Sequence, residues 1–288
     1  MTRACLKLIF LLILITAGME VQANLFDKRK LKASRGDVDA QLSVGLMYAN
    51  GEGVSKDIKE AAKWFRAAAE QGNALAQFNL GEMYARGNGV PQNYHEAAAW
   101  YLKAAEQDNV TAKFNLGLMY GNGQGVRYDP NKAEKWLTEA AERGDAKMQF
   151  ALGKMYTHGV EVPYDAKNAE KWLREAAGQG DANMQFFVGQ LYRDLGELVA
   201  QDREEAVLWF HKAAEQGHAM AKLNLGVMYL NGEGIQVDMV QAYKWLYLAA
   251  TSGNEEALRK IKTAETVMSQ KQIKEAQVLA TDWLVQHK

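Results

Sequence analysis

The sequence predicts an all-α protein, an α-solenoid of six tandem antiparallel helix pairs followed by a helical cap. Six tryptophans recur at intervals of 36 or 37 residues, and six tyrosines recur at the same intervals. Glycines, 25 in all, return at matching places in each interval, whereas only three prolines interrupt the 288 residues. Because a fixed period of this length is typical of repeat architectures, we expect one helical unit to be stacked six times.

The two aromatic series define the repeats. The tryptophans are Trp64, Trp100, Trp136, Trp172, Trp209 and Trp245, and the tyrosines are Tyr48, Tyr84, Tyr120, Tyr156, Tyr192 and Tyr229. Each repeat is taken to begin at a glycine-like turn, where Asp108 replaces glycine in the third. The repeats are then 36–71, 72–107, 108–143, 144–179, 180–216 and 217–252.

Both halves of each repeat have the pattern of a helix. In repeat 2, Ala76, Leu80 and Met83 lie on one face of a helix with 3.6 residues per turn, and Gly87 and Gly89 follow as a terminating turn. In the second half of each repeat an alanine–tryptophan–alanine series has helical spacing. Small alanines beside a large ring allow helices to approach closely, which predicts tight packing between successive pairs.

Residues outside the repeats have separate roles. Residues 24–35 form a lead-in, and residues 253–288 continue an apolar helical stripe that begins with a Ser269–Gln272 capping box. We predict that this second segment covers the exposed face of the last repeat, as the ends of a solenoid require.

The N-terminus has the features of a signal peptide. Arg3 and Lys7 precede an apolar run over 8–15, and residues 21–23 offer small-residue cleavage, so residues 1–23 are expected to be removed. This predicts a periplasmic or secreted protein without an integral membrane span after cleavage. The competing interpretation is an uncleaved anchor, although the run is short for a bilayer.

Composition argues against several classes of function. The single cysteine, Cys5, lies in the predicted signal peptide, which excludes disulfides, thiolate catalysis and cysteine-bound zinc from the mature chain. A formal charge of −1 without a basic stripe argues against nucleic acid. The five histidines and the few serines lie in no catalytic or metal-binding motif, so we expect no catalytic residue, metal or cofactor.

The repeat resembles the Sel-1-like repeat, a relative of the tetratricopeptide repeat. Repeat 2 shows the pattern as Gly72, Ala76, Gln77, Leu80, Gly81, Met83, Tyr84, Gly87, Gly89, Val90, Ala97, Trp100, Ala104 and Ala105. The resemblance covers residues 36–252. It implies a right-handed superhelix with the first helices lining its inner surface, and a bacterial adaptor that assembles protein complexes.

Positions that vary between repeats are the candidates for partner binding, because the scaffold does not dictate them. The fourth, eighth and eleventh residues of each first helix share one stripe, which the resemblance places in the inner groove. An asparagine recurs at the eighth position and can clamp a peptide backbone, while lysines add positive charge in repeat 4. The candidates are Asn79, Glu82, Asn115, Lys147, Lys154, Asn183, Phe187, Gln190 and Asn224. The alternatives are that they are ordinary polar surface residues, or that the asparagine bonds a neighbouring turn.

The sequence therefore predicts a monomeric, non-enzymatic scaffold of the bacterial cell envelope that binds a protein or peptide segment in its groove. Alternatives are a cell-wall-acting or β-lactamase-like hydrolase, or a periplasmic regulator of a membrane sensor. A recurring glutamine, as at Gln41 and Gln77, is interpreted as structural because it is too regular to encode a partner. Repeat 5 departs from the pattern over 192–201, either by loop drift or as a recognition loop.

Overall fold

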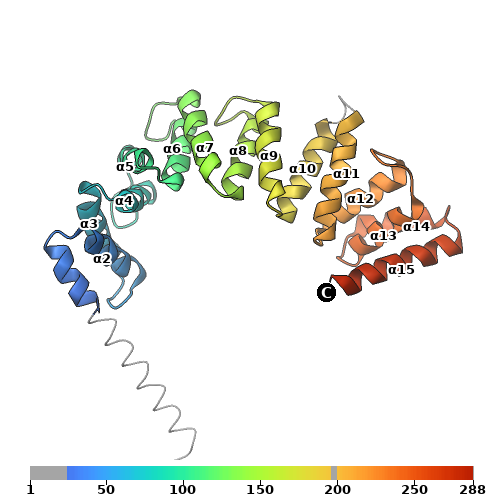
Figure 1. The fold of residues 1–288 in the computed structure, drawn as a ribbon, viewed down its shortest axis with the longest axis horizontal. Helices are drawn as coiled ribbons and strands as arrows, with labels where there is room; N and C mark the ends of the chain where they lie inside the picture. The colour runs from blue at the N-terminus through green and yellow to red at the C-terminus, as the bar shows by residue number, and fades with distance from the viewer. Residues whose placement is uncertain (1–24, 196–199, 288) are drawn as a thin grey trace, which may run out of the picture. The chain divides into compact units, whose positions relative to one another are not determined.

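A computed structural model describes residues 25–195 and 200–287, and their regular structure is entirely helical (Figure 1). The predicted signal peptide, Cys5 and part of the repeat 5 loop lie outside these residues. Helix pairs stack along the chain, and each first helix packs most extensively on the second helix of its own repeat. The predicted all-α helix-pair fold is confirmed.

The chain divides into two compact units. The N-terminal unit comprises Met1–Gly144 with Gly159–Tyr164, and the C-terminal unit comprises Asp145–His158 with Asp165–Lys288. After a helix over 25–34, the N-terminal unit contains α2 (Val38–Asn50), α3 (Ile58–Glu70), α4 (Ala74–Arg86), α5 (Tyr94–Glu106), α6 (Val110–Asn122) and α7 (Pro130–Arg143). The C-terminal unit contains α8 (Ala146–His158), α9 (Ala166–Gly178), α10 (Ala182–Leu195), α11 (Ala200–Glu215), α12 (Ala219–Asn231), α13 (Met239–Ala250), α14 (Glu255–Glu265) and α15 (Gln270–Gln286).

Side-chain caps fix where the helices begin and end. Asn73 starts α4 by accepting a hydrogen bond from the backbone nitrogen of Ala76, and Asn93 starts α5 in the same way. Gly87 ends α4 at φ +71°, a left-handed conformation in which its N–H reaches the carbonyl of Met83. Asp37, Asn109 and His218 cap other first helices at the equivalent position, and Gly51, Gly123 and Gly232 end those helices as Gly87 ends α4.

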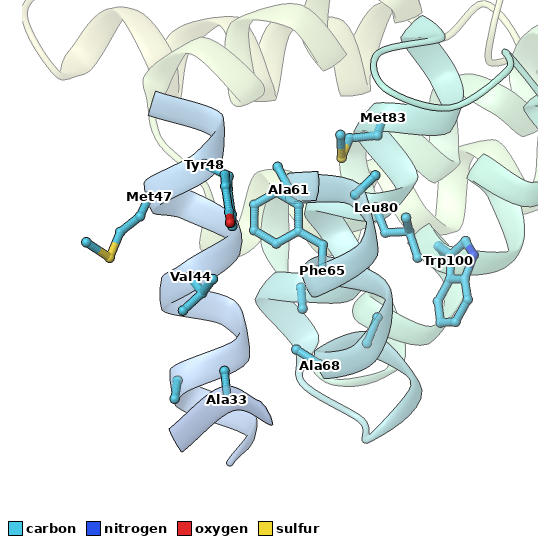
Figure 2. Close-up of a cluster of buried hydrophobic side chains, with 14 of the residues drawn as sticks. Ala33, Val44, Met47, Tyr48, Ala61, Phe65, Ala68, Leu80, Met83 and Trp100 are labelled. Atoms are coloured by element: carbon cyan, nitrogen blue, oxygen red, sulfur yellow. The ribbon is translucent and has the colours of Figure 1, made fainter. Parts of the chain in front are cut away.

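The two helices of a pair meet through a glycine. A Cβ built on Gly81 of α4 would lie 2.7 Å from the ring of Tyr101 in α5, and one on Gly45 would lie 2.6 Å from the ring of Phe65. Figure 2 shows Phe65 beside Tyr48, with Ala61 and Ala68 on the same helix. The residue after each tryptophan therefore fills the space above the glycine, whereas Trp64 and Trp136 themselves are only partly buried.

The recurring glutamines lie on the first helices. Gln77 and Gln41 each bond both to the segment before their helix and to the end of their own repeat. Gln77 Nε2 donates to the carbonyl of Ala69 at 3.1 Å, and its Oε1 accepts from Gln107 Nε2 at 2.7 Å. Gln41 makes the equivalent bonds with Ala33 and Gln71. These bonds satisfy a buried amide within the scaffold, which supports the structural interpretation.

Repeat 3 replaces this pair with charges. Lys113 and Arg143 occupy the two glutamine positions, and both reach Asp108 Oδ1, at 2.7 and 2.8 Å. Lys113 Nζ also lies 2.9 Å from Glu139. Asp108 adopts φ +63° at a position that glycine holds in the other repeats, so the three substitutions form one linked cluster.

The last two helices close the C-terminal unit. Figure 1 shows α15 running alongside α13, and buried residues of α13, α14 and α15, among them Leu246, Ile261 and Ala276, share one apolar cluster. The predicted capping box is present, with Ser269 and Gln272 bonded in both directions.

Candidate partner-binding surface

The predicted stripe lies on the first helices α4, α6, α8, α10 and α12, and its members have different surroundings in the two units. In the N-terminal unit, Glu82 accepts from Asn115 Nδ2 at 3.0 Å and from the Tyr101 hydroxyl at 2.7 Å. Arg86 forms an ion pair with the same carboxylate at 2.7 Å. Glu82 and Asn115 thus satisfy one another across neighbouring repeats.

The Glu82 carboxylate also affects its neighbour. Burial raises the pKa of the Tyr101 hydroxyl, and the hydrogen bond to the Glu82 carboxylate raises it further. Tyr101 therefore stays protonated and donates at any physiological pH.

Asn79 holds the position equivalent to Asn115, but it lacks the acceptor. Its side-chain nitrogen is buried and has no hydrogen-bond partner within the described part of the chain. The position that Glu82 fills for Asn115 is held by Leu46 in the preceding repeat, and leucine cannot accept a hydrogen bond. Leaving this nitrogen unsatisfied costs free energy. Of the three predicted residues in the N-terminal unit, Asn79 is thus the one with an unused polar group.

In the C-terminal unit the structure brings Lys154 and Phe187 together with a residue that sequence reasoning missed, Phe150. The two phenylalanine rings meet edge to face, with centroids 5.1 Å apart and planes at 78°. Lys154 Nζ lies 5.4 Å from the Phe187 centroid and 6.0 Å from that of Phe150. The result is a partly buried aromatic pair beneath an exposed ammonium group, on two consecutive first helices.

Phe150 was missed because a phenylalanine recurs at its position, as at Phe78 and Phe114, and a recurring residue looks like scaffold. The signal that could have found it is Phe187, which puts an aromatic ring where most repeats have a small or polar residue. The contact joins the seventh residue of repeat 4, Phe150, to the eighth residue of repeat 5, Phe187, so it forms only across the repeats.

The ring contacts described above for Phe150, Phe187 and Lys154 do not include the other predicted residues of this unit. Lys147 and Asn183 are exposed in the first turns of α8 and α10, where their backbone nitrogens donate to Asp145 and Asp181. Gln190 and Asn224 are partly buried on α10 and α12. α8 carries Lys147 and Lys154 and no acidic residue, so its stripe is positively charged.

Within residues 25–195 and 200–287, no three histidine, cysteine, aspartate or glutamate side chains are grouped to hold a metal ion. Across the same residues, no helix has the length and apolar character needed to cross a membrane.

These features define a helical-repeat protein whose first helices present varied side chains on a regular scaffold. The Sel1 repeat family model matches residues 38–73, 74–109, 110–145, 146–181, 182–218 and 219–254. The chain therefore belongs to the Sel1 repeat family, as its resemblance predicted. Sel1 repeat proteins are generally non-catalytic scaffolds for protein interactions.

Solved structures agree with this assignment. The chain is similar to c5321, a protective antigen of uropathogenic Escherichia coli strains that displays an SLR fold, with 25% identity, a TM-score of 0.55 and coverage of 92% of this chain and 80% of that one. It is also similar to a Sel1 repeat protein from Oxalobacter formigenes, with 33% identity, a TM-score of 0.54 and coverage of 74% and 85%. No curated protein matches the chain.

Proposed function

We propose that the protein is an exported, non-enzymatic scaffold of the bacterial envelope that holds a segment of a partner protein on the first helices of its C-terminal unit. The observation that carries this proposal is the Phe150–Phe187 pair beneath Lys154. Such a pair offers an apolar anchor with a cation at its edge, the combination that concentrates binding energy in protein interfaces.

The charge of this surface suggests the chemistry of the partner. Lys147 and Lys154 lie on α8 without an acidic neighbour on that helix, and α12 also carries no acidic residue. We expect the bound segment to place an apolar side chain against the two rings and a carboxylate near Lys154. Asn183, Gln190 and Asn224 would form the polar rim.

The experiment compares capture of envelope proteins by the purified mature chain and by a Lys154→Glu/Phe187→Ala variant. A partner that uses this surface should be recovered at least about tenfold less by the variant, since a lost anchor and a reversed charge together remove more than 1.4 kcal/mol. Lys167→Glu, on the exposed side of α9, is the matched control and should bind like the wild type. Equal recovery by the wild type and the double variant would remove the surface from consideration.

Export is a separate part of the proposal and rests on residues 1–23. Residues 1–30 fused to alkaline phosphatase without its own signal should give active enzyme, because that enzyme needs an oxidising compartment. A fusion lacking residues 8–15 should be inactive. Activity that does not depend on the apolar run would contradict export by this segment.

A further inference from the structure

A cavity of about 700 Å³ lies at the α6–α7 turn of the N-terminal unit. Its walls include His95 from α5, Tyr120 from the end of α6, Arg127 and Tyr128 from the turn, and Lys132 from α7. The turn can lie this close to α5 only because Gly125 has no side chain: a Cβ there would be 2.2 Å from the carbonyl oxygen of Tyr94. The cavity thus has two cations, an imidazole and two phenol rings in its lining.

The positive charge in this cavity is only partly neutralised from within. Asp129 is its one acidic residue, and Asp129 Oδ1 already accepts from the backbone nitrogen of Lys132 at 3.0 Å as the cap of α7. Lys132 Nζ lies 3.8 Å from the other carboxylate oxygen and 5.1 Å from the Tyr120 ring centroid. Arg127 and His95 use no side-chain atom in a hydrogen bond or ion pair with the residues that the structure describes, and both are exposed.

The helical scaffold does not require these residues. Lys132 stands where repeats 1 and 2 have Glu60 and Glu96, and Arg127 stands where repeats 2 and 4 have Pro91 and Pro163. The same turn is built in those repeats with the opposite charge or with no charge. The pair of cations Arg127 and Lys132 is therefore particular to repeat 3, whereas Tyr120 recurs in every repeat and Tyr128 has a counterpart in Tyr164 of repeat 4.

We propose that this cavity binds a carboxylate of a partner protein, held by Arg127 and Lys132 between the rings of Tyr120 and Tyr128. The planar guanidinium of arginine matches a carboxylate with two parallel hydrogen bonds, and the lysine adds a point charge. A phosphate is disfavoured because the start of α7 offers fewer backbone donors than an ordinary helix start: Pro130 has no N–H, and Asp129 holds the amide of Lys132. A protein is favoured over nucleic acid because the chain has a formal charge of −1.

This site adds to the proposed scaffold role but does not depend on the Phe150–Phe187 surface, because every residue that lines it belongs to the N-terminal unit. The probe is the blocked peptide acetyl-Ser-Asp-Glu-amide, with acetyl-Ser-Asn-Gln-amide as its neutral counterpart. Backbone amide signals of the turn over 123–129 are followed by NMR during titration into the mature chain. The acidic peptide should shift these signals and bind at least about tenfold more tightly than the neutral one.

The variant Arg127→Gln/Lys132→Gln should lose at least about tenfold in affinity for the acidic peptide. Arg35→Gln/Lys59→Gln removes two exposed cations elsewhere in the same unit and should bind like the wild type. All four positions are exposed, so unchanged thermal unfolding would verify that each variant is folded. Equal binding of both peptides, or full binding by the first variant, would overturn the proposal. Inorganic phosphate that binds as tightly as the peptide through the same residues would also overturn it, in favour of an unspecific anion site.

Discussion

Trp283, in the last helix, donates a hydrogen bond from its indole Nε1 to Glu215 Oε2 at 2.8 Å, across 68 residues of sequence. The same ring stacks on His287, with centroids 4.1 Å apart, and lies beneath Lys222 Nζ at 4.1 Å. Lys222 occupies a position that glutamine fills in most repeats. The C-terminal helix is thus held by one aromatic anchor against the end of α11 and the start of α12.

Replacing that anchor should loosen the C-terminal unit. Trp283→Ala is expected to lower the free energy of unfolding by about 3–5 kcal/mol, because it removes a large buried side chain. Trp283→Phe keeps most of the apolar contact but loses the hydrogen bond, for a loss of about 1–2 kcal/mol. Urea unfolding followed by circular dichroism measures both. Val285→Ala, at a residue that is 66% exposed, is the control. A loss no larger for Trp283→Ala than for this control would contradict the anchor.

Replacing a helical glycine by alanine should change stability in opposite directions at Gly117 and Gly178. A Cβ on Gly117 would lie 2.6 Å from Leu137 Cγ and 3.1 Å from its backbone nitrogen, so Gly117→Ala should destabilise by about 1–3 kcal/mol through overpacking. Gly178, at the end of α9, has nothing within 4 Å of such a Cβ. Gly178→Ala should therefore be neutral or raise stability by up to about 1 kcal/mol through helix propensity. Thermal unfolding of the two variants compares them, and a shift of the same sign in both would contradict the packing argument.

The charge cluster of repeat 3 (Asp108, Lys113, Glu139 and Arg143) should make the stability of the fold depend on pH in the acidic range. Hydrogen bonds from Lys113 and then Arg143, with their positive charges, lower the pKa of Asp108 from its ordinary 3.8 to about 2. A carboxylate with a lowered pKa in the folded state stabilises the fold above its unfolded pKa. This contribution is lost as the pH falls from 3.8 through about 2.

Asp108→Asn tests this, since asparagine tolerates a positive φ and cannot ionise. Urea midpoints measured across this pH range should fall less steeply for the variant than for the wild type. Asp39→Asn removes an exposed carboxylate that forms no ion pair within the described residues, and it should keep the wild-type profile. Parallel profiles for the wild type and Asp108→Asn would refute the assignment.

If Asp108, Lys113 and Arg143 are replaced together by the residues found at the same positions of repeat 2, stability should be nearly unchanged. Lys113→Met leaves Asp108 and Glu139 without their shared cation and should cost about 1–3 kcal/mol. Asp108→Gly/Lys113→Gln/Arg143→Gln recreates the arrangement of Gln77 with Gln107, so it should be within about 1 kcal/mol of the wild type because the three changes couple. Urea unfolding measures the variants. A triple variant less stable than Lys113→Met would show that the two arrangements are not equivalent.

Asn79 and Asn115 should differ in the sign of their effect. Asn79→Leu removes a buried side-chain nitrogen that has no hydrogen-bond partner among the described residues, and we expect stability to rise by about 1 kcal/mol. Asn115→Leu breaks the bond to Glu82 and should lower stability by about the same amount. Thermal unfolding compares the pair. If Asn79→Leu is also destabilising, its amide has a structural partner in solution, and the contrast with Asn115 is contradicted.

The sequence alone was sufficient for the fold class, the number of repeats and the helical cap, since each depends on the spacing of residues along one chain. Trp64 and Trp100 mark the same place in successive repeats whatever their surroundings. The structural role of Gln77 was also predictable, because its recurrence at Gln41 and elsewhere implies a scaffold contact.

Contacts between repeats were decided only by the tertiary structure. Asn79 and Asn115 are the same residue at the same position, yet one has an unused amide and the other bonds to Glu82. Phe150 became part of the candidate surface only when its ring met that of Phe187. The physical reason is that a regular period fixes which residues face inward, whereas a hydrogen bond or a ring contact depends on the side chain that the neighbouring repeat supplies.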